Sequence, residues 1–259
     1  MPAAQHRTLS RIISGEASGW LTVLPLADEG YDLSATKFRD QLALRYHRSP
    51  PDLPSACDGC GVPFSLQHGL DCAKGGLIKK GHDQVRNCEA QLAKEAWGGV
   101  VLEPVLVPEL DRAGHPSLQA DWSARGVWEG SRVAFFDNRI IDADAPSYVS
   151  SNTSWQALAN RAAQQKRAKY QHVVEDLRGS ITPLVCSTDG VLHVEYRAYQ
   201  RRLAHRLALK QEQPFSSMMA WVWILLQFAI IRAVDLRLRG ARMKFCGLNP
   251  ADGLNEIFT

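Results

Sequence analysis

Apolar positions recur with helical periodicity in several stretches of the chain. Phe38, Leu42 and Tyr46 fall on one face of a helix predicted from about residue 33 to residue 46, which Ser34 or Thr36 can cap. Further helices are predicted at about 82–97, where Gly98-Gly99 would end the helix, at 154–177, and, as two or three helices, up to about residue 240. The predicted inward positions of the 82–97 helix are Val85, Ala90, Leu92, Ala93 and Ala96.

Short apolar runs between these helices predict strands. One run at 100–108 is broken by Pro104, and two runs at 119–127 and 132–141 flank a turn at 128–131. A further run at 180–188 ends at the turn residues Asp189-Gly190. The predicted order is therefore helix, three strands, helix, strand and terminal helices.

The most apolar segment of the chain could be a membrane-spanning helix or a buried helix of the core. Residues 218–234 approach the lower length limit of a membrane-spanning helix, but Gln227 and Arg232 interrupt the run. We expect a buried core helix and no membrane partner. With 259 residues, 45% hydrophobic and 22% charged, the chain is long enough for one large domain or two small ones.

Charge is distributed unevenly along the chain. The net charge is only +3, but ten Lys or Arg residues stand against two acids between Arg197 and Lys244. Such a local excess can attract phosphate groups, although a solvated helix face would have the same pattern.

Four cysteine and histidine residues have metal-ligand spacing. Six cysteines are too few and too uneven for a disulfide scaffold, and the first residues lack an apolar signal core, so we expect a reducing intracellular compartment. The four residues Cys57, Cys60, His68 and Cys72 follow the pattern C-x2-C-x7-H-x3-C in a glycine-rich stretch. This pattern predicts a closed structural Zn²⁺ site rather than four residues at chance spacing.

Two aspartates are placed symmetrically about the turn near residue 129. An antiparallel hairpin centred there would set Asp121 opposite Asp137, and two like charges in that position call for a cation such as Mg²⁺. The basic group of such a site could be Lys166 or Lys169 on the next helix, or Arg139 two residues after Asp137. Two surface aspartates at strand ends are the alternative.

Several of these motifs together resemble one family. The chain resembles, over about residues 15–245, the C-terminal region of site-specific non-LTR retrotransposon polyproteins that insert into ribosomal RNA genes. The resemblance is carried by Ser18-Gly-Trp-Leu, residues 38–46, Cys57-Asp-Gly-Cys, residues 68–76, residues 81–86, Glu103-Pro104, Ala120-Asp121, residues 135–139, residues 166–170 and residues 182–185.

The resemblance implies a fold, an activity and site residues. It implies a Cys-Cys-His-Cys zinc cluster before a restriction-enzyme-like endonuclease of the PD-(D/E)XK class, an α+β fold in which helices flank a small mixed sheet. The implied activity is Mg²⁺-dependent cleavage of target DNA to prime reverse transcription. Asp121 takes the place of the first acid, Asp137 of the second and Lys166 of a lysine displaced onto the following helix. His82 matches the histidine at the start of the first core helix.

The chain also departs from that family. Ala120 replaces the proline before the first acid, Gly81 replaces a basic residue, and no Tyr-x-Asp-Asp polymerase motif is present. The chain looks like a detached fragment of such an element, with nuclear localisation implied by the resemblance. The alternatives are a nuclease, an inactive remnant that binds DNA or RNA, and a remnant that binds proteins.

The expected parts are an N-terminal helical segment and linker at 1–54, an N-terminal zinc cluster at 55–80, a nuclease core at 81–190, basic helices at 191–245 and a tail at 246–259.

Overall fold

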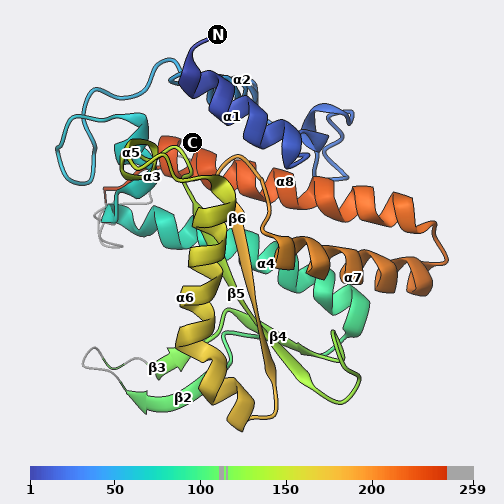
Figure 1. Ribbon diagram of the computed structural model, residues 1–259. Helices are drawn as coiled ribbons and strands as arrows, with labels where there is room; N and C mark the ends of the chain where they lie inside the picture. Colours follow the sequence, from blue (N-terminus) through green and yellow to red (C-terminus); the bar gives the residue numbers. More distant parts are fainter. Residues whose placement is uncertain (111–113, 115, 244–259) are drawn as a thin grey trace, which may run out of the picture.

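The computed structural model describes residues 1–110, 114 and 116–243 of the chain. Its α-helices are α1 Ala3–Ser14, α2 Ala35–Arg45, α3 Leu66–Asp71, α4 Leu77–Trp97, α5 Pro146–Ser150, α6 Trp155–Asp176, α7 Val194–Gln211 and α8 Phe215–Arg239 (Figure 1). Its strands are β1 Val100–Leu102, β2 Val105–Leu110, β3 Pro116–Gln119, β4 Trp122–Arg125, β5 Val133–Ile141 and β6 Ser180–Ser187. The expected tail at 246–259 lies outside the described residues.

The main sheet has four strands in the order β1-β4-β5-β6. Strand β4 is antiparallel to both β1 and β5, whereas β6 runs parallel to β5 after a crossover through α6. The predicted mixed sheet flanked by helices is confirmed, and the run at 100–108 splits at Pro104 into β1 and β2 as expected. Strand β2 pairs with β3 in a separate two-stranded sheet.

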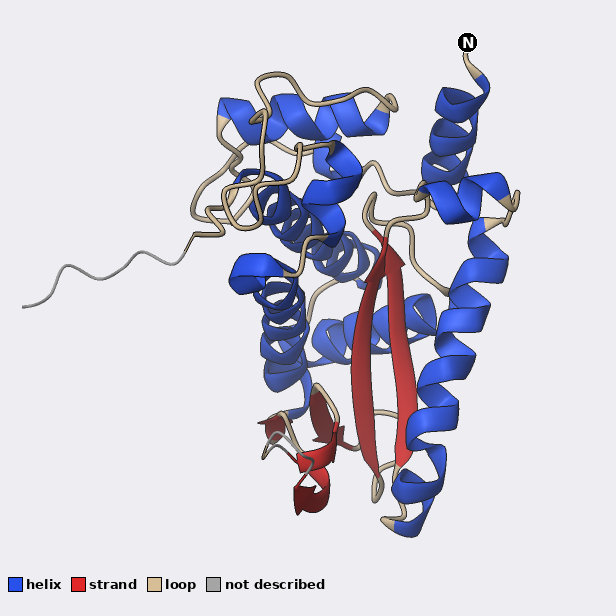
Figure 2. Ribbon diagram, turned by 90° about the vertical axis from the view of Figure 1, so that its left-hand side faces the viewer, coloured by secondary structure: helices blue, strands red, loops and turns tan. Residues whose placement is uncertain are grey.

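The two faces of the sheet pack against different helices. Phe135 and Ile181 pack with Tyr170 and Val174 of α6 in one cluster of buried side chains. The alternate residue Phe136 faces the other way, where it belongs to the main core with residues of α4, α7 and α8. This alternation follows from the two-residue period of a strand. Figure 2 shows α6 beside the long strands, with several other helices across the sheet from it.

The main core is centred on stacked aromatic rings. The rings of Trp122 and Phe136 lie 3.9 Å apart between centroids and are nearly parallel, and Tyr199 of α7 contacts both. All five predicted inward residues of α4 are buried here, which confirms that face of the helix. Gly98 ends α4 with a φ of +90°, a conformation that glycine adopts without strain.

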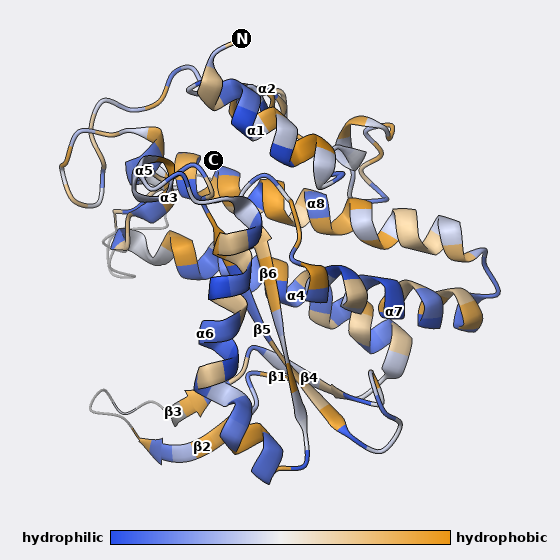
Figure 3. Ribbon diagram, in the orientation of Figure 1, coloured by the Kyte–Doolittle hydropathy of each residue, from blue (hydrophilic) through white to orange (hydrophobic). Residues whose placement is uncertain are grey.

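Helix α8 lies between the α4 and α7 layer and the N-terminal helices (Figure 1). It is long and apolar enough to cross a membrane, and 50% of its most apolar 18-residue window is buried. Figure 3 shows that α8 is more hydrophobic than α6. Within the structure α8 packs against α4 and α7 on one side and against α2 and α3 on the other.

Three features near the N-terminus differ from the expectations. Helix α1 was not predicted, and the Cys/His cluster is not N-terminal, because α1 and α2 precede it. The face of α2 that Phe38, Leu42 and Tyr46 share is only partly buried: Phe38 and Tyr46 are exposed, whereas Asp40 and Gln41 are buried. The reason is an ion pair with a distant residue, because Arg239 of α8 donates to both carboxylate oxygens of Asp40 at 2.7 and 3.0 Å.

The buried carboxyl group of Glu89 makes stability depend on pH. Its Oε1 accepts a hydrogen bond from the Tyr196 hydroxyl at 2.9 Å, but burial raises the pKa of Glu89 to about 7 from an ordinary 4.5. The folded state holds this proton more tightly than the unfolded state. The protonated Glu89 carboxyl group therefore makes its full contribution to the free energy of unfolding below about pH 4.5. The contribution is lost as the pH rises through about 7, and it amounts to about 3 kcal/mol.

We therefore expect Glu89→Gln to be more stable than the wild type at pH 8 and to lose most of that advantage at pH 5. Urea unfolding of both proteins at the two pH values measures the difference. An equal difference in unfolding free energy at pH 5 and pH 8 would show that Glu89 does not titrate in the folded protein.

Candidate functional site

A loop and a short helix bring the four predicted metal ligands together. Cys57 and Cys60 lie in a tight loop in which the Cys57 amide donates to the Val62 carbonyl at 2.8 Å and Gly61 has a φ of +73°. His68 lies in α3, and Cys72 is the residue that ends this helix. The hydroxyl of Ser65 caps α3 by accepting from the His68 amide at 3.1 Å.

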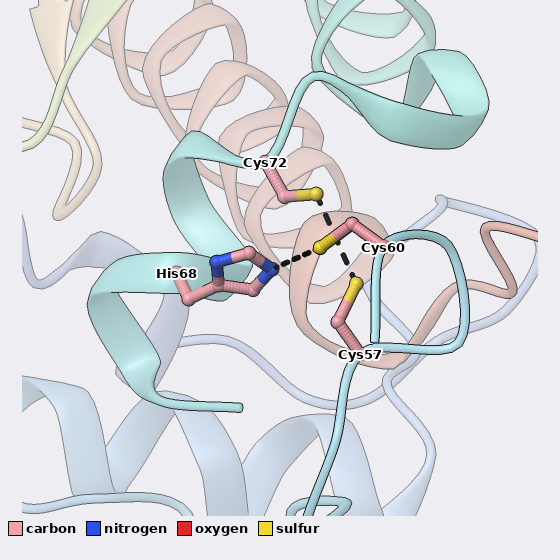
Figure 4. A group of neighbouring side chains, drawn as sticks. All are labelled: Cys57, Cys60, His68 and Cys72. Carbon is pink, nitrogen blue, oxygen red and sulfur yellow. Dashed lines mark hydrogen bonds between the residues drawn. The ribbon is translucent and has the colours of Figure 1, made fainter. Parts of the chain in front are cut away.

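The ligand atoms of these four residues face one another (Figure 4). All four lie within 4.8 Å of one another, with Cys57 Sγ 3.8 Å from Cys72 Sγ and Cys60 Sγ 3.4 Å from His68 Nε2. Two thiolates on a tetrahedral zinc ion at about 2.3 Å each would be about 3.8 Å apart. The cluster could therefore hold a metal ion such as zinc.

The electrostatics of the cluster also suit a cation. Although desolvation works against it, hydrogen bonds from His68 and from backbone amides lower the pKa of the Cys57 thiol to about 6. A thiol must lose its proton to ligate a metal, so a lowered pKa reduces the cost of binding near neutral pH.

The cluster is fixed to the end of α8. The Asp58 carboxylate accepts from the Arg242 amide at 2.7 Å, and the Arg242 guanidinium donates to the Gly69 carbonyl at 3.0 Å. A Cβ at Gly75 would come within 2.5 Å of the Arg242 backbone, so this close approach requires glycine. The chain then enters α4, which carries His82.

The predicted hairpin register places the two aspartates as expected. Trp122 pairs with Phe136 and Ser123 with Phe135, so Asp121 and Asp137 occupy the next opposed positions. The Asp121 amide donates to the Phe136 carbonyl at 3.0 Å, and Asp121 Oδ2 accepts from the Asn138 amide at 2.5 Å. The two carboxylates therefore lie side by side near the end of the β4–β5 ladder.

Each aspartate has a basic partner from a different helix. His82 Nε2 of α4 is 3.0 Å from Asp121 Oδ2, and the Lys166 ammonium of α6 forms an ion pair with Asp137. Tyr170, one helical turn after Lys166, donates its hydroxyl to the Gln119 carbonyl at 2.9 Å and lies 3.5 Å from Asp137 Oδ1. The four predicted catalytic residues are thus brought together.

The pKa shifts reflect this crowding of charge. Burial, and then the neighbouring charge of Asp121, raises the pKa of Asp137, which Lys166 partly opposes. Burial works against protonation of His82, but the hydrogen bond to Asp121 and its charge raise the pKa of His82. Such shifts are typical of catalytic sites and also of structural ion-pair networks.

The other two candidates for the basic group have different partners. Lys169 Nζ lies 3.2 Å from the Tyr170 hydroxyl, and Arg139 donates to Gln165 Oε1 at 2.8 Å. Of the three candidates, Lys166 is therefore the one that contacts Asp137. Tyr170 was not predicted as a site residue, although its i+4 spacing from Lys166 on a helix could have indicated it.

A second group of charges beside His82 was also not predicted. Arg86 donates to Glu103 Oε1 at 2.6 Å and lies 3.1 Å from Asp83 Oδ1, while the Glu103 amide donates to the Asp121 carbonyl at 2.9 Å. Arg86 thus joins α4 to the turn between β1 and β2, which is bonded to the Asp121 backbone. The Glu103 backbone has a φ of +48°, so this loop is held in a conformation uncommon for a side chain of that size.

The acidic site is not a preformed cage of protein ligands. Within the described ranges, the Cys57, Cys60, His68 and Cys72 group meets the geometry for three or more metal ligands, and the aspartate pair does not form such a group. Mg²⁺ commonly uses only one or two carboxylates and takes its other ligands from water and phosphate. The residues present are compatible with an ion of that kind, but they do not enclose one.

Comparisons with known proteins identify no family for this chain. No family model matches it, and no curated protein matches it. The function must therefore be argued from the residues and the geometry of the site.

Proposed function

We propose that the chain is a metal-dependent DNA endonuclease of the PD-(D/E)XK type, related to the nuclease region of non-LTR retrotransposons. The observation that carries the proposal is the grouping of Asp121, Asp137 and Lys166, with His82 hydrogen-bonded to Asp121. An acid pair that holds a divalent ion, with a lysine beside it, can support hydrolysis of a phosphodiester bond.

Each residue has a role in this proposal. Asp121 and Asp137 would hold Mg²⁺, which when bound lowers the pKa of a coordinated water molecule and offsets charge on the phosphate. Lys166 would stabilise the charge that develops on the phosphate as water attacks phosphorus and the P–O bond to the leaving strand breaks. His82 would keep Asp121 in its orientation through the 3.0 Å contact.

The Cys/His cluster has a structural role in the proposal. Its ligand geometry fits Zn²⁺, and the bound ion would fix the loop that leads into α4 and so the position of His82. The resemblance to retrotransposon nucleases would place the protein in the nucleus.

A second candidate is a protein that binds nucleic acid without cleaving it. The burial of Asp137 favours it, because this residue is only 3% exposed and its carboxylate is already paired with Lys166. An ion and a phosphate group would have to displace the lysine from Asp137. The same lysine would then be free to contact the phosphate.

Nicking of supercoiled plasmid by purified protein with Mg²⁺ or Mn²⁺ tests the proposal. We expect nicking by the wild type that stops with chelator and falls by about 10²-fold in Lys166→Met, a loss typical of removing one charge-stabilising group. Lys169→Met is the matched control, since that lysine lies one turn further along α6 and contacts Tyr170. Absence of nicking by a folded wild type that still binds DNA would instead support the second candidate. Equal losses of nicking activity in Lys166→Met and Lys169→Met would contradict the role assigned to Lys166.

A further inference from the structure

Helix α7 presents a row of basic side chains on its exposed surface. Its exposed side chains include Arg197, Arg201, Arg202, Arg206 and Lys210, which extend over about 20 Å at 1.5 Å per residue. Glu195, the one acid of this helix, pairs with Arg167 of α6. Within the described part of the chain, no carboxylate lies within ion-pair distance of the five arginine and lysine side chains of this row.

Several of these side chains are held by backbone carbonyl groups. Arg202 donates to the Val127 carbonyl at 2.8 Å and Lys210 to the Glu95 carbonyl at 2.7 Å. These contacts hold the side chains in place without neutralising their charge. The row is therefore an ordered electropositive surface of the kind that a phosphate backbone neutralises.

An open cavity adjoins this row at the start of α8. Its volume is about 600 Å³, and its walls include Arg197 and Arg201 of the basic row together with Phe215, Met219 and Trp223 of α8. Phe215 is 45% exposed, an unusual position for a phenylalanine. Glu16, beyond the end of α1, is the acid among the residues that line the cavity.

Aromatic side chains beside a basic groove are the features that bind unpaired bases. A base can stack on an aromatic ring only when it is not already stacked in a duplex, and each such contact contributes about 1–3 kcal/mol. Arginine can hold the flanking phosphate and can also stack on the base. The cavity is large enough for one base. The carboxylates of an acidic peptide could pair with the arginines but would not stack on the aromatic wall, whereas a base would.

This surface is separate from the acidic site. Asp137 points to the face of the sheet that α6 covers, where it contacts Tyr170. Helix α7 packs on the opposite face, where Tyr199 contacts Phe136 (Figure 2). A nucleic acid on α7 therefore does not occupy the proposed catalytic site.

We propose that α7 and the adjoining cavity form a binding site for single-stranded nucleic acid, with phosphates along the arginines and one base in the cavity. The site goes beyond the proposed nuclease, and it can exist whether or not the aspartates cleave DNA.

Fluorescence anisotropy tests the site, with labelled oligo(dT), oligo(rU) and a duplex, each about 12 nucleotides long, in buffer without added Mg²⁺. Charge reversal in Arg197→Glu/Arg201→Glu is expected to weaken oligo(dT) binding at least 10-fold. It should also reduce the slope of log K against log salt by about 1.4, since two phosphate contacts are lost from a single strand. The matched control Arg48→Glu/Arg161→Glu changes charge equally at two exposed positions outside α7 and should retain binding.

The base contact is tested separately with Phe215→Ser. Loss of one stacked base predicts a roughly 5- to 150-fold weaker affinity for oligo(dT) and no change for the duplex. Any of three results would overturn the proposal. These are equal losses of oligo(dT) affinity in the two charge-reversal variants, unchanged oligo(dT) binding in Phe215→Ser, and binding of a labelled oligoglutamate as tight as that of oligo(dT). The relative affinities of oligo(dT) and oligo(rU) distinguish DNA from RNA. Unchanged oligo(dT) binding in a nicking-deficient Asp137→Asn variant is expected and separates this site from the nuclease.

Discussion

Replacing Asp137 by asparagine is expected to lower Mg²⁺-dependent nicking by at least about 10²-fold without lowering the stability of the fold. Asparagine has nearly the same shape but cannot supply the negative charge that the proposed cation requires. In the metal-free protein, however, the Asp137 charge is itself unfavourable, because it is buried and lies beside Asp121. Removing it relieves that repulsion, while the side chain of Lys166 stays 22% exposed and can be hydrated.

Parallel measurements of nicking rate and of urea unfolding separate the two effects. Asp28→Asn, at an exposed position, is the control for loss of one negative charge. Retention of activity in Asp137→Asn would contradict a catalytic role for this residue. A loss of stability as large as the loss of activity would indicate that the Asp137–Lys166 ion pair serves the fold instead.

Removal of the metal from the Cys/His cluster is expected to have the largest effect on stability. Structural zinc sites contribute apparent binding free energies of about 10–16 kcal/mol in small zinc modules, and here the cluster connects α3, α4 and the end of α8. We expect the wild type to contain one zinc ion per chain. Cys72→Ser should lose that ion, unfold at lower urea concentration and nick DNA more slowly, since α4 carries His82.

Cys88→Ser is the matched control, because Cys88 lies in α4 outside the cluster. Metal analysis and urea unfolding of the three proteins measure the effect. Zinc-free wild-type protein that unfolds at the same urea concentration as the zinc-loaded form would contradict the structural role. A similar loss of zinc in Cys88→Ser would assign the metal to other residues.

Local patterns were sufficient to predict much of the site. The four metal ligands are close in sequence, so their spacing alone indicated a cluster. The symmetric placement of Asp121 and Asp137 about one turn fixed the hairpin register that the structure has. The predicted inward positions of α4 followed from apolar periodicity, because they are ordinary hydrophobic side chains, whereas its buried Glu89 did not.

The features that were missed depend on partners far away in the chain. Helix α1 buries Arg11, whose guanidinium binds Asp144 and Asp189, and no local pattern indicates that an arginine will be buried. Asp40 of α2 is buried for the same kind of reason, with Arg239 as its partner. Lys166 could be told apart from Lys169 and Arg139 only once the packing of α6 against the sheet was known.

Titration of Mn²⁺ into zinc-loaded protein, monitored by isothermal calorimetry, shows whether the two aspartates hold a divalent ion. We expect a binding event in the wild type that is lost in Asp121→Asn and in Asp137→Asn but retained in Asp28→Asn. Mn²⁺ is suited to this measurement because it prefers the carboxylate and water ligands of the acidic site to the thiolates of the Cys/His cluster. Equal Mn²⁺ binding in all four proteins would contradict the claim that Asp121 and Asp137 hold the divalent ion.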